Sequence, residues 1–110
     1  MTALDDAIRA VDGAEDQARA ELEALVRIPS ISADPGCRDE VRASAELTAD
    51  LLRAHGLEAV RLAGVDGSHP YVIGEWMHAG AGALTVLLYA HHDVQPPGIV
   101  ENWEKMKDQR

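Results

Sequence analysis

The feature that most constrains the fold is a run of apolar residues, 84–90, that leads directly into His91-His92-Asp93 and is closed by Pro96-Pro97. A nearly continuous apolar run of this length is typical of a β-strand covered on both faces, and such strands lie in the middle of a sheet. Proline cannot donate to a strand ladder, so the strand ends before residue 96. The run therefore predicts a central strand with histidine and aspartate at its carboxyl end.

The sequence His91-His92-Asp93 places two chemical groups on one face of that strand. Because successive side chains point to opposite faces, His91 and Asp93 share a face and His92 lies on the other. A carboxylate at this spacing accepts one imidazole N–H and leaves the other nitrogen's lone pair free, which prepares a histidine to bind a metal. We expect His91 to be a metal ligand oriented by Asp93. The alternative is a purely structural hydrogen-bonded pair, and for His92 we expect packing rather than ligation.

Composition excludes several classes of protein. The chain has 110 residues, 46% of them apolar, which suits one small domain, and no run is long enough to span a membrane. The net charge of −9 argues against nucleic acid or an anionic membrane as a partner. The N-terminus lacks the pattern of a signal peptide, and Cys37 is the only cysteine, so we expect a cytoplasmic protein without an internal disulfide. A catalytic role for Cys37 is not expected.

The first half of the chain has the periodicity of helices. Apolar residues recur every three or four positions over residues 4–28, which predicts an amphipathic helix that is weakened at Gly13 and stopped by Pro29. A second helix is predicted from residue 38 or 39 to residue 54. Gly56 is placed to close it in the left-handed conformation.

After Gly56 the periodicity becomes that of strands. Residues 57–62, 71–76 and 84–90 are the predicted strands, so the fold class is α/β, with two N-terminal helices followed by three strands. A central strand needs neighbours on both edges and helices on both faces, and nothing after Pro97 supplies them. We therefore expect the opening part of a larger mixed α/β/α sheet.

The last residues differ from the rest in composition. Every basic residue before position 104 is arginine, whereas Lys105 and Lys107 fall in the closing segment 104–110. This polar tail is either foreign or frame-shifted, or the difference arose by chance. The sequence thus divides into a domain segment, 1–103, and the tail, 104–110.

Three segments resemble a family of zinc metallopeptidases that includes carnosinase-like dipeptidases, aminoacylases, acetylornithine deacetylases and succinyl-diaminopimelate desuccinylases. LEALVRIPSISADP (22–35) is similar to the family's opening helix and turn, and AELTADLLRAHGLEAVRL (45–62) to its second helix and first strand. TVLLYAHHDVQPPG (85–98) is similar to its metal-ligand strand and carries the most specific match. Ala90 stands where the family often has glycine. The form Asp-Val-Gln-Pro-Pro most resembles the dipeptidase branch.

The resemblance implies a zinc-exopeptidase-type fold and hydrolysis of the amide bond of a dipeptide or an N-acyl amino acid. Two Zn²⁺ ions per site would be expected, with Mn²⁺ or Co²⁺ as alternatives. His91 would be a zinc ligand, and Asp93 would be the carboxylate of the catalytic centre that orients it. The family's remaining ligands, its catalytic glutamate and its lid and dimerisation domain correspond to later sequence. Full-length relatives would be homodimers, and the present chain is expected to be inactive alone.

The remaining candidates have simpler interpretations. Structural or solvent-facing roles are expected for His55, His69 and His78, packing for Trp76 and Trp103, and turn or cap hydroxyls for Ser30 and Ser32. A different class of function also stays open. The chain would then be a small non-catalytic α/β module that pairs through the open edge of its sheet.

Overall fold

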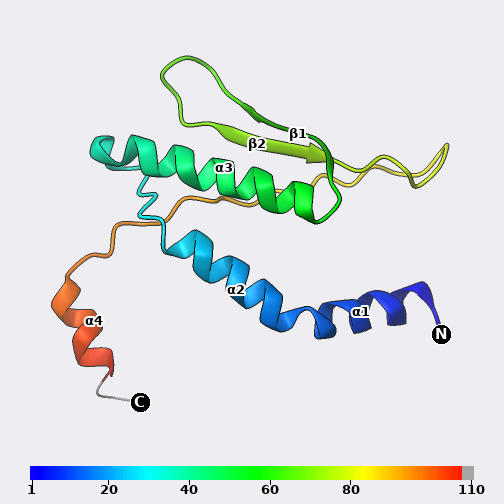
Figure 1. Ribbon diagram of the computed structural model, residues 1–110, viewed down its shortest axis with the longest axis horizontal. Helices are drawn as coiled ribbons and strands as arrows, with labels where there is room; N and C mark the ends of the chain where they lie inside the picture. Colours follow the sequence, from blue (N-terminus) through cyan, green and yellow to red (C-terminus); the bar gives the residue numbers. More distant parts are fainter. Residues whose placement is uncertain (108–110) are drawn as a thin grey trace.

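The computed structural model describes residues 1–107. In chain order the elements are α1 (Ala3–Gly13), α2 (Glu15–Val26), a 3₁₀ turn η1 (Pro35–Cys37), α3 (Arg38–Ala54), β1 (Glu58–Ala63), β2 (Tyr71–Glu75) and α4 (Val100–Lys107). The two strands form an antiparallel hairpin that lies along α3, while α1 and α2 extend away from it (Figure 1). The α/β class is therefore confirmed, although its sheet is smaller than predicted.

The predicted N-terminal helix is divided in two. Thr2 begins α1 with a reciprocal capping box, in which its hydroxyl accepts from the Asp5 backbone N–H and the Asp5 carboxylate accepts from the Thr2 backbone N–H. The helix ends at Gly13, and α2 begins after Ala14, so the weak point predicted at Gly13 is a real break. Neither helix buries a side chain.

Helix α3 provides the small core of the protein. Its buried residues are Val41, Ser44, Ala45 and Ala49, which form one stripe at helical spacing. At the other end Gly56 takes φ +86°, and the Leu57 N–H donates to the Leu52 carbonyl (3.0 Å), which is the Schellman ending that the glycine predicted.

The hairpin pairs Ala63 with Tyr71 and Arg61 with Ile73. A bulge between Glu58 and Arg61 interrupts the ladder, and Ala59 within it has φ +49°. Both predicted strands of this hairpin are confirmed to within one residue at each end.

The prediction of a third, central strand is wrong. Residues 84–90 follow the loop after β2 and run back along α3, but they belong to no strand (Figure 1). Leu84, Leu87 and Leu88 are 94%, 91% and 88% exposed. The physical reason is that strand structure requires a ladder partner, and the described residues place none beside this segment.

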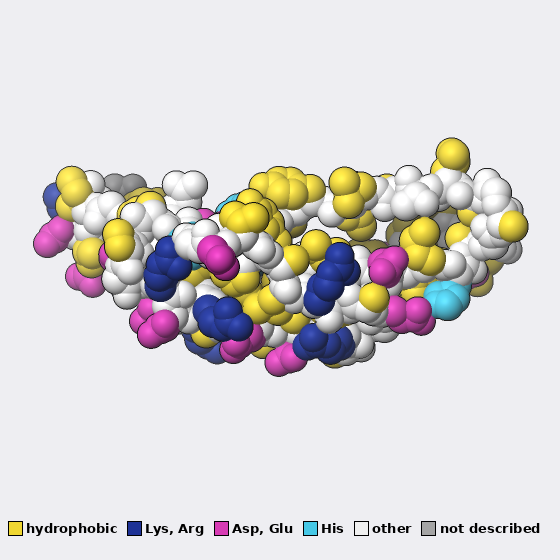
Figure 2. Space-filling model, turned by 90° about the horizontal axis from the view of Figure 1, so that it is seen from above, with side chains coloured by type: hydrophobic (Ala, Val, Ile, Leu, Met, Phe, Trp, Pro, Cys, Tyr) yellow, Lys and Arg dark blue, Asp and Glu magenta, His cyan; other side chains and the backbone are white. Residues whose placement is uncertain are grey.

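The chain is expanded for its size. Its radius of gyration is 17.6 Å, whereas a compact domain of this length has about 13 Å. Its accessible surface is 9142 Å², about 3,200 Å² more than the roughly 5,900 Å² of a compact protein of this mass. Figure 2 shows hydrophobic side chains gathered along the middle of one face, with acidic and basic side chains along an edge. The chain thus leaves many of its large apolar side chains exposed to solvent.

The described C-terminal part ends in α4, which includes residues 104–107 of the predicted polar tail. The Trp103 indole N–H donates to the Pro97 carbonyl (2.6 Å) and ties the helix to the preceding loop. None of the helices within residues 1–107 combines the length and apolar character required to cross a bilayer.

Candidate functional site

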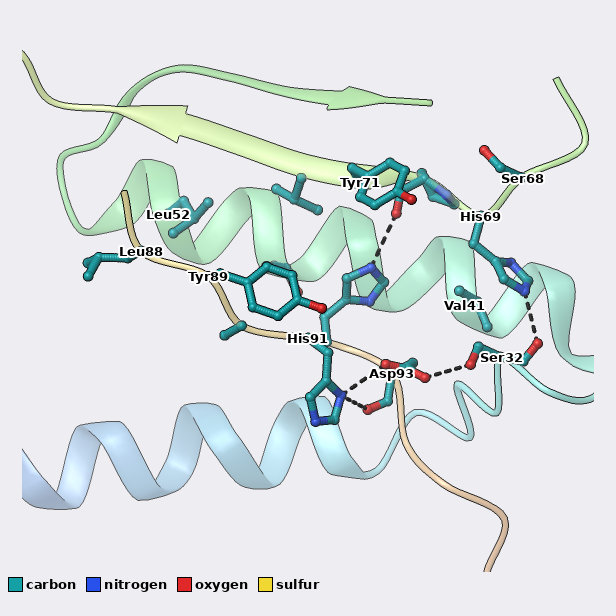
Figure 3. A pocket seen from close by; sticks show the side chains of 15 residues that line it. Ser32, Val41, Leu52, Ser68, His69, Tyr71, Leu88, Tyr89, His91 and Asp93 are labelled. Atoms are coloured by element: carbon teal, nitrogen blue, oxygen red, sulfur yellow. Dashed lines mark hydrogen bonds and ion pairs between the residues drawn. The ribbon is translucent and has the colours of Figure 1, made fainter. Parts of the chain in front are cut away.

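His91 and Asp93 lie together directly after residues 84–90, hereafter the extended segment, as their spacing predicts. The His91 Nδ1 atom is 2.9 Å from Asp93 Oδ1 and 3.0 Å from the Asp93 backbone carbonyl (Figure 3). The imidazole is largely exposed, at 69% of its side-chain surface, whereas the carboxylate side chain is 32% exposed. One face of the segment therefore presents an accessible histidine backed by a more sheltered carboxylate.

The contacts of His91 determine its tautomer. A backbone carbonyl is only an acceptor, so the Nδ1 atom beside the Asp93 carbonyl must carry the proton. In the neutral ring the Nε2 atom then keeps its lone pair. An imidazole held in this way is suited to bind a metal ion through Nε2.

Ser32 holds the second oxygen of the Asp93 carboxylate. Its hydroxyl donates to Asp93 Oδ2 across 2.5 Å, although the two residues are separated by 61 positions (Figure 3). This hydrogen bond, and secondarily the one from His91, lowers the pKa of Asp93 against the opposing effect of its partial burial. The interpretation of Ser32 as a turn or cap hydroxyl is therefore wrong.

The backbone around Asp93 is fixed by the turn that follows α2. The Val94 N–H donates to the Ser30 carbonyl (3.0 Å), and Ile31 and Val94 form an isolated parallel bridge. Ser30 is fully buried, and its hydroxyl has no hydrogen-bond partner among the described residues, so it is a packing residue rather than a cap. These contacts set the position of Asp93 even though residues 84–90 pair with no strand in the described part of the chain.

His92 ties the same segment to the helix and hairpin. Its Nε2–H donates to the Pro70 carbonyl (3.3 Å), and its Nδ1 lies 3.1 Å from Ser44 Oγ. The Ser44 hydroxyl also lies 2.9 Å from the His92 carbonyl, which it can reach as a donor. His92 is half-buried, so the structural role predicted for it agrees with its surroundings.

The described residues offer one prepared metal ligand and not a complete site. Residues 1–107 contain no group of three or more histidine, cysteine, aspartate or glutamate side chains that could hold a metal ion. A catalytic zinc site requires about three protein ligands. His91 fits one position of such a site, and no catalytic step through a metal follows from these residues alone.

The other histidines are held by hydrogen bonds elsewhere. His55 and His78 each contact a carboxylate through Nε2, at Glu21 (2.9 Å) and Glu58 (2.8 Å) respectively. His69 Nε2 donates to the Ser32 carbonyl (3.0 Å), which brings it nearer to the site than its sequence position suggested. The structural roles expected for all three agree with these contacts.

Three further candidates are resolved by their surroundings. Trp76 and Trp103 are 58% and 57% exposed, so the prediction that they are packing residues is wrong for this structure.

Partial burial and the nearby carboxylates of Asp34 and Glu40 raise the pKa of the Cys37 thiol. A thiol that stays protonated is a poor nucleophile, consistent with the non-catalytic interpretation of Cys37.

A hollow of about 670 Å³ lies between the hairpin, α3 and the extended segment. Tyr71, Leu88, Tyr89 and His91 are among the side chains that line it (Figure 3). Ser32 and Asp93 also line it, so the hollow adjoins the candidate site.

Comparison with known proteins shows a distant similarity to a metallodipeptidase. The chain is similar to the Cys-Gly metallodipeptidase DUG1 of Saccharomyces cerevisiae, with 24% identity over 111 residues. The match covers 92% of this chain but only 23% of that protein, so the chain spans about a quarter of the relative's length. No protein-family model matches the chain, and no solved structure matches it at a significant level. The chain therefore has a distant, partial similarity to a metallodipeptidase.

Proposed function

We propose that this chain is the N-terminal part of the catalytic domain of a metal-dependent dipeptidase. In this proposal His91 is one metal ligand, and Asp93 is the catalytic-centre carboxylate that orients it. The observation that carries the proposal is the geometry of that pair, in which Nδ1–H is bound to Asp93 and Nε2 is left free. The similarity to a Cys-Gly metallodipeptidase over 92% of the chain supports the same chemistry.

The proposed substrate is a dipeptide or an N-acyl amino acid, and the proposed metal is Zn²⁺, with Mn²⁺ or Co²⁺ as alternatives. A bound zinc pair would supply Lewis-acid activation of the amide carbonyl and of a water molecule. The chain's own contribution is to hold one imidazole in the ligand tautomer. Because the described residues supply only that one ligand, we expect the chain alone to bind zinc weakly and to lack peptidase activity.

The metal assignment is tested by titrating Zn²⁺ into the isotopically labelled chain and following the histidine side chains by NMR. We expect the His91 signals to respond at lower zinc concentration than those of His78. Both residues are paired with a carboxylate, but His78 is held through Nε2. His91→Ala should remove the earliest response, and the matched control His78→Ala should not. If other histidines of His91→Ala still responded at the low zinc concentration at which wild-type His91 responds, the ligand role would be refuted.

The activity assignment is tested separately with simple dipeptides, including Cys-Gly, in the presence of Zn²⁺ or Mn²⁺. No turnover is expected from the chain alone. Robust metal-dependent hydrolysis that disappears in His91→Ala would show that the chain has a complete site, contrary to the proposal.

A second function, that of a non-catalytic module that pairs through an open strand, is favoured by one specific observation. Residues 84–90 are uncharged and have no strand partner within residues 1–107, with Leu87, Leu88 and Tyr89 about nine-tenths exposed. Such a segment is a template for β-pairing with another chain. A defined, concentration-dependent oligomer in analytical ultracentrifugation, abolished by Leu87→Lys but not by the distant control Leu4→Lys, would favour this function.

A further inference from the structure

The strongest unassigned feature is the hydroxyl of Ser32. It lies in the turn between α2 and α3, where the sequence suggests only local turn chemistry. Its one hydrogen bond in the described structure goes instead to Asp93 Oδ2, at 2.5 Å. This distance is within the range of charge-assisted O–H···O⁻ hydrogen bonds, which are among the stronger ones in proteins.

The two oxygens of the Asp93 carboxylate receive donors from different parts of the chain. Oδ1 accepts from His91 Nδ1–H, and Oδ2 accepts from Ser32. Two donors on opposite oxygens fix the rotation of the carboxylate about its last side-chain bond. With the Ser32 hydroxyl removed, only the exposed His91 ring would hold the group.

Ser32 is itself held in place. Its carbonyl accepts the Nε2–H of His69 (3.0 Å), and the neighbouring Ile31 is bridged to Val94. The hydroxyl therefore reaches Asp93 from a backbone that is anchored on both sides. A donor on a fixed backbone restrains the orientation of the carboxylate, whereas a donor on a mobile loop would move together with the carboxylate and would not restrain it.

We propose that Ser32 is a positioning residue of the candidate metal site. By fixing the Asp93 carboxylate it holds the second acceptor of His91 Nδ1–H in place beside the Asp93 backbone carbonyl, which favours the tautomer that leaves Nε2 free. The metal-related part of this inference rests on the proposed function, but the orientation of the imidazole does not.

The test uses the full 110-residue chain and two-bond ¹H–¹⁵N NMR spectra of its histidines, recorded at about pH 8. In the wild type we expect His91 in the Nδ1–H form. Ser32→Ala should shift the ratio of the two neutral tautomers by up to about tenfold toward the Nε2–H form that free histidine prefers, because the carboxylate is no longer held in place as an acceptor and only the Asp93 backbone carbonyl still is. Ser32→Thr retains a hydroxyl and should restore the wild-type ratio.

Ser68→Ala is the matched control, since the Ser68 hydroxyl donates to a turn carbonyl, that of Val65, at 2.7 Å. It should leave His91 unchanged. An unchanged His91 tautomer in Ser32→Ala, or the free-histidine ratio already present in the wild type, would overturn the positioning role.

Zinc titration separates this inference from the proposed function. If wild-type His91 binds Zn²⁺ and Ser32→Ala changes neither the tautomer nor the zinc response, the positioning role fails and the metal site stands. If Ser32→Ala shifts the tautomer but wild-type His91 does not respond to Zn²⁺, the orienting contact stands and the metal function fails. If both hold, Ser32→Ala should weaken the zinc response of His91 by about tenfold, the lower end of the effect of outer-shell partners.

Discussion

Replacing Leu87 with lysine distinguishes the structure from the fold that the sequence predicts. Leu87 is 91% exposed and lies outside the two-stranded sheet, so Leu87→Lys should change the free energy of unfolding by no more than about 0.5 kcal/mol. In a buried central strand the same change would remove a core leucine and insert a charge, at a cost of about 3 kcal/mol or more.

Val41→Ala is the matched core substitution. Val41 is 1% exposed, and losing two methyl groups costs about 1.6 kcal/mol in transfer free energy, or about 2 kcal/mol with the resulting cavity. Only Val41, Ala45 and Ala49 are buried apolar residues in the described chain, so this loss is a large part of the few kcal/mol that so small a core provides.

The assay is urea unfolding followed by circular dichroism at 222 nm, at protein concentrations low enough to exclude association. The wild type and Leu87→Lys should have the same midpoint. Val41→Ala should lower the midpoint strongly or lose helical signal before urea is added. A loss of about 2 kcal/mol or more in Leu87→Lys would refute the exposed placement of residues 84–90.

Three further predictions concern single groups. The pKa of Asp93 is lowered in the folded chain, so its contribution to stability is present above the unfolded-state pKa of about 3.9 and is lost as the pH falls through that value to the lower folded-state pKa. Urea midpoints measured between about pH 3 and pH 6 should show this loss, and it should be smaller in Asp93→Asn. Gly56→Ala should destabilise the chain by about 1 kcal/mol because φ is +86°, whereas Gly13→Ala, with open space around the added methyl group, should be neutral or stabilising by up to about 1 kcal/mol; thermal melts compare the two. Cys37 should react with iodoacetamide more slowly than a free cysteine at pH 8, because its pKa is raised; equal rates by mass spectrometry would contradict this.

Local signals in the sequence predicted the local structure well. The break near Gly13, the left-handed ending at Gly56 and the hairpin strands all depend on residues close together in the chain. The contact between His91 and Asp93 is equally local, since extended backbone places both side chains on one side. Such features follow from backbone geometry and need no knowledge of distant partners.

The features that the sequence could not predict depend on contacts between residues that are far apart in the chain. The apolar run 84–90 has the composition of a strand, but composition does not supply a neighbouring strand, and the described residues contain none beside it. The Ser32–Asp93 hydrogen bond joins residues 61 positions apart, and serine in a turn is so common that its spacing carries no signal. The contact between the Ser44 hydroxyl and the His92 ring, which joins residues 48 positions apart, was missed for the same reason.

The backbone hydrogen bond from Val94 to Ser30 has a consequence for how the His91 ring is held. It fixes the backbone directly after Asp93, whereas the seven residues before His91 have no strand partner among residues 1–107. The orientation of the His91 ring therefore does not depend on a strand pairing with residues 84–90.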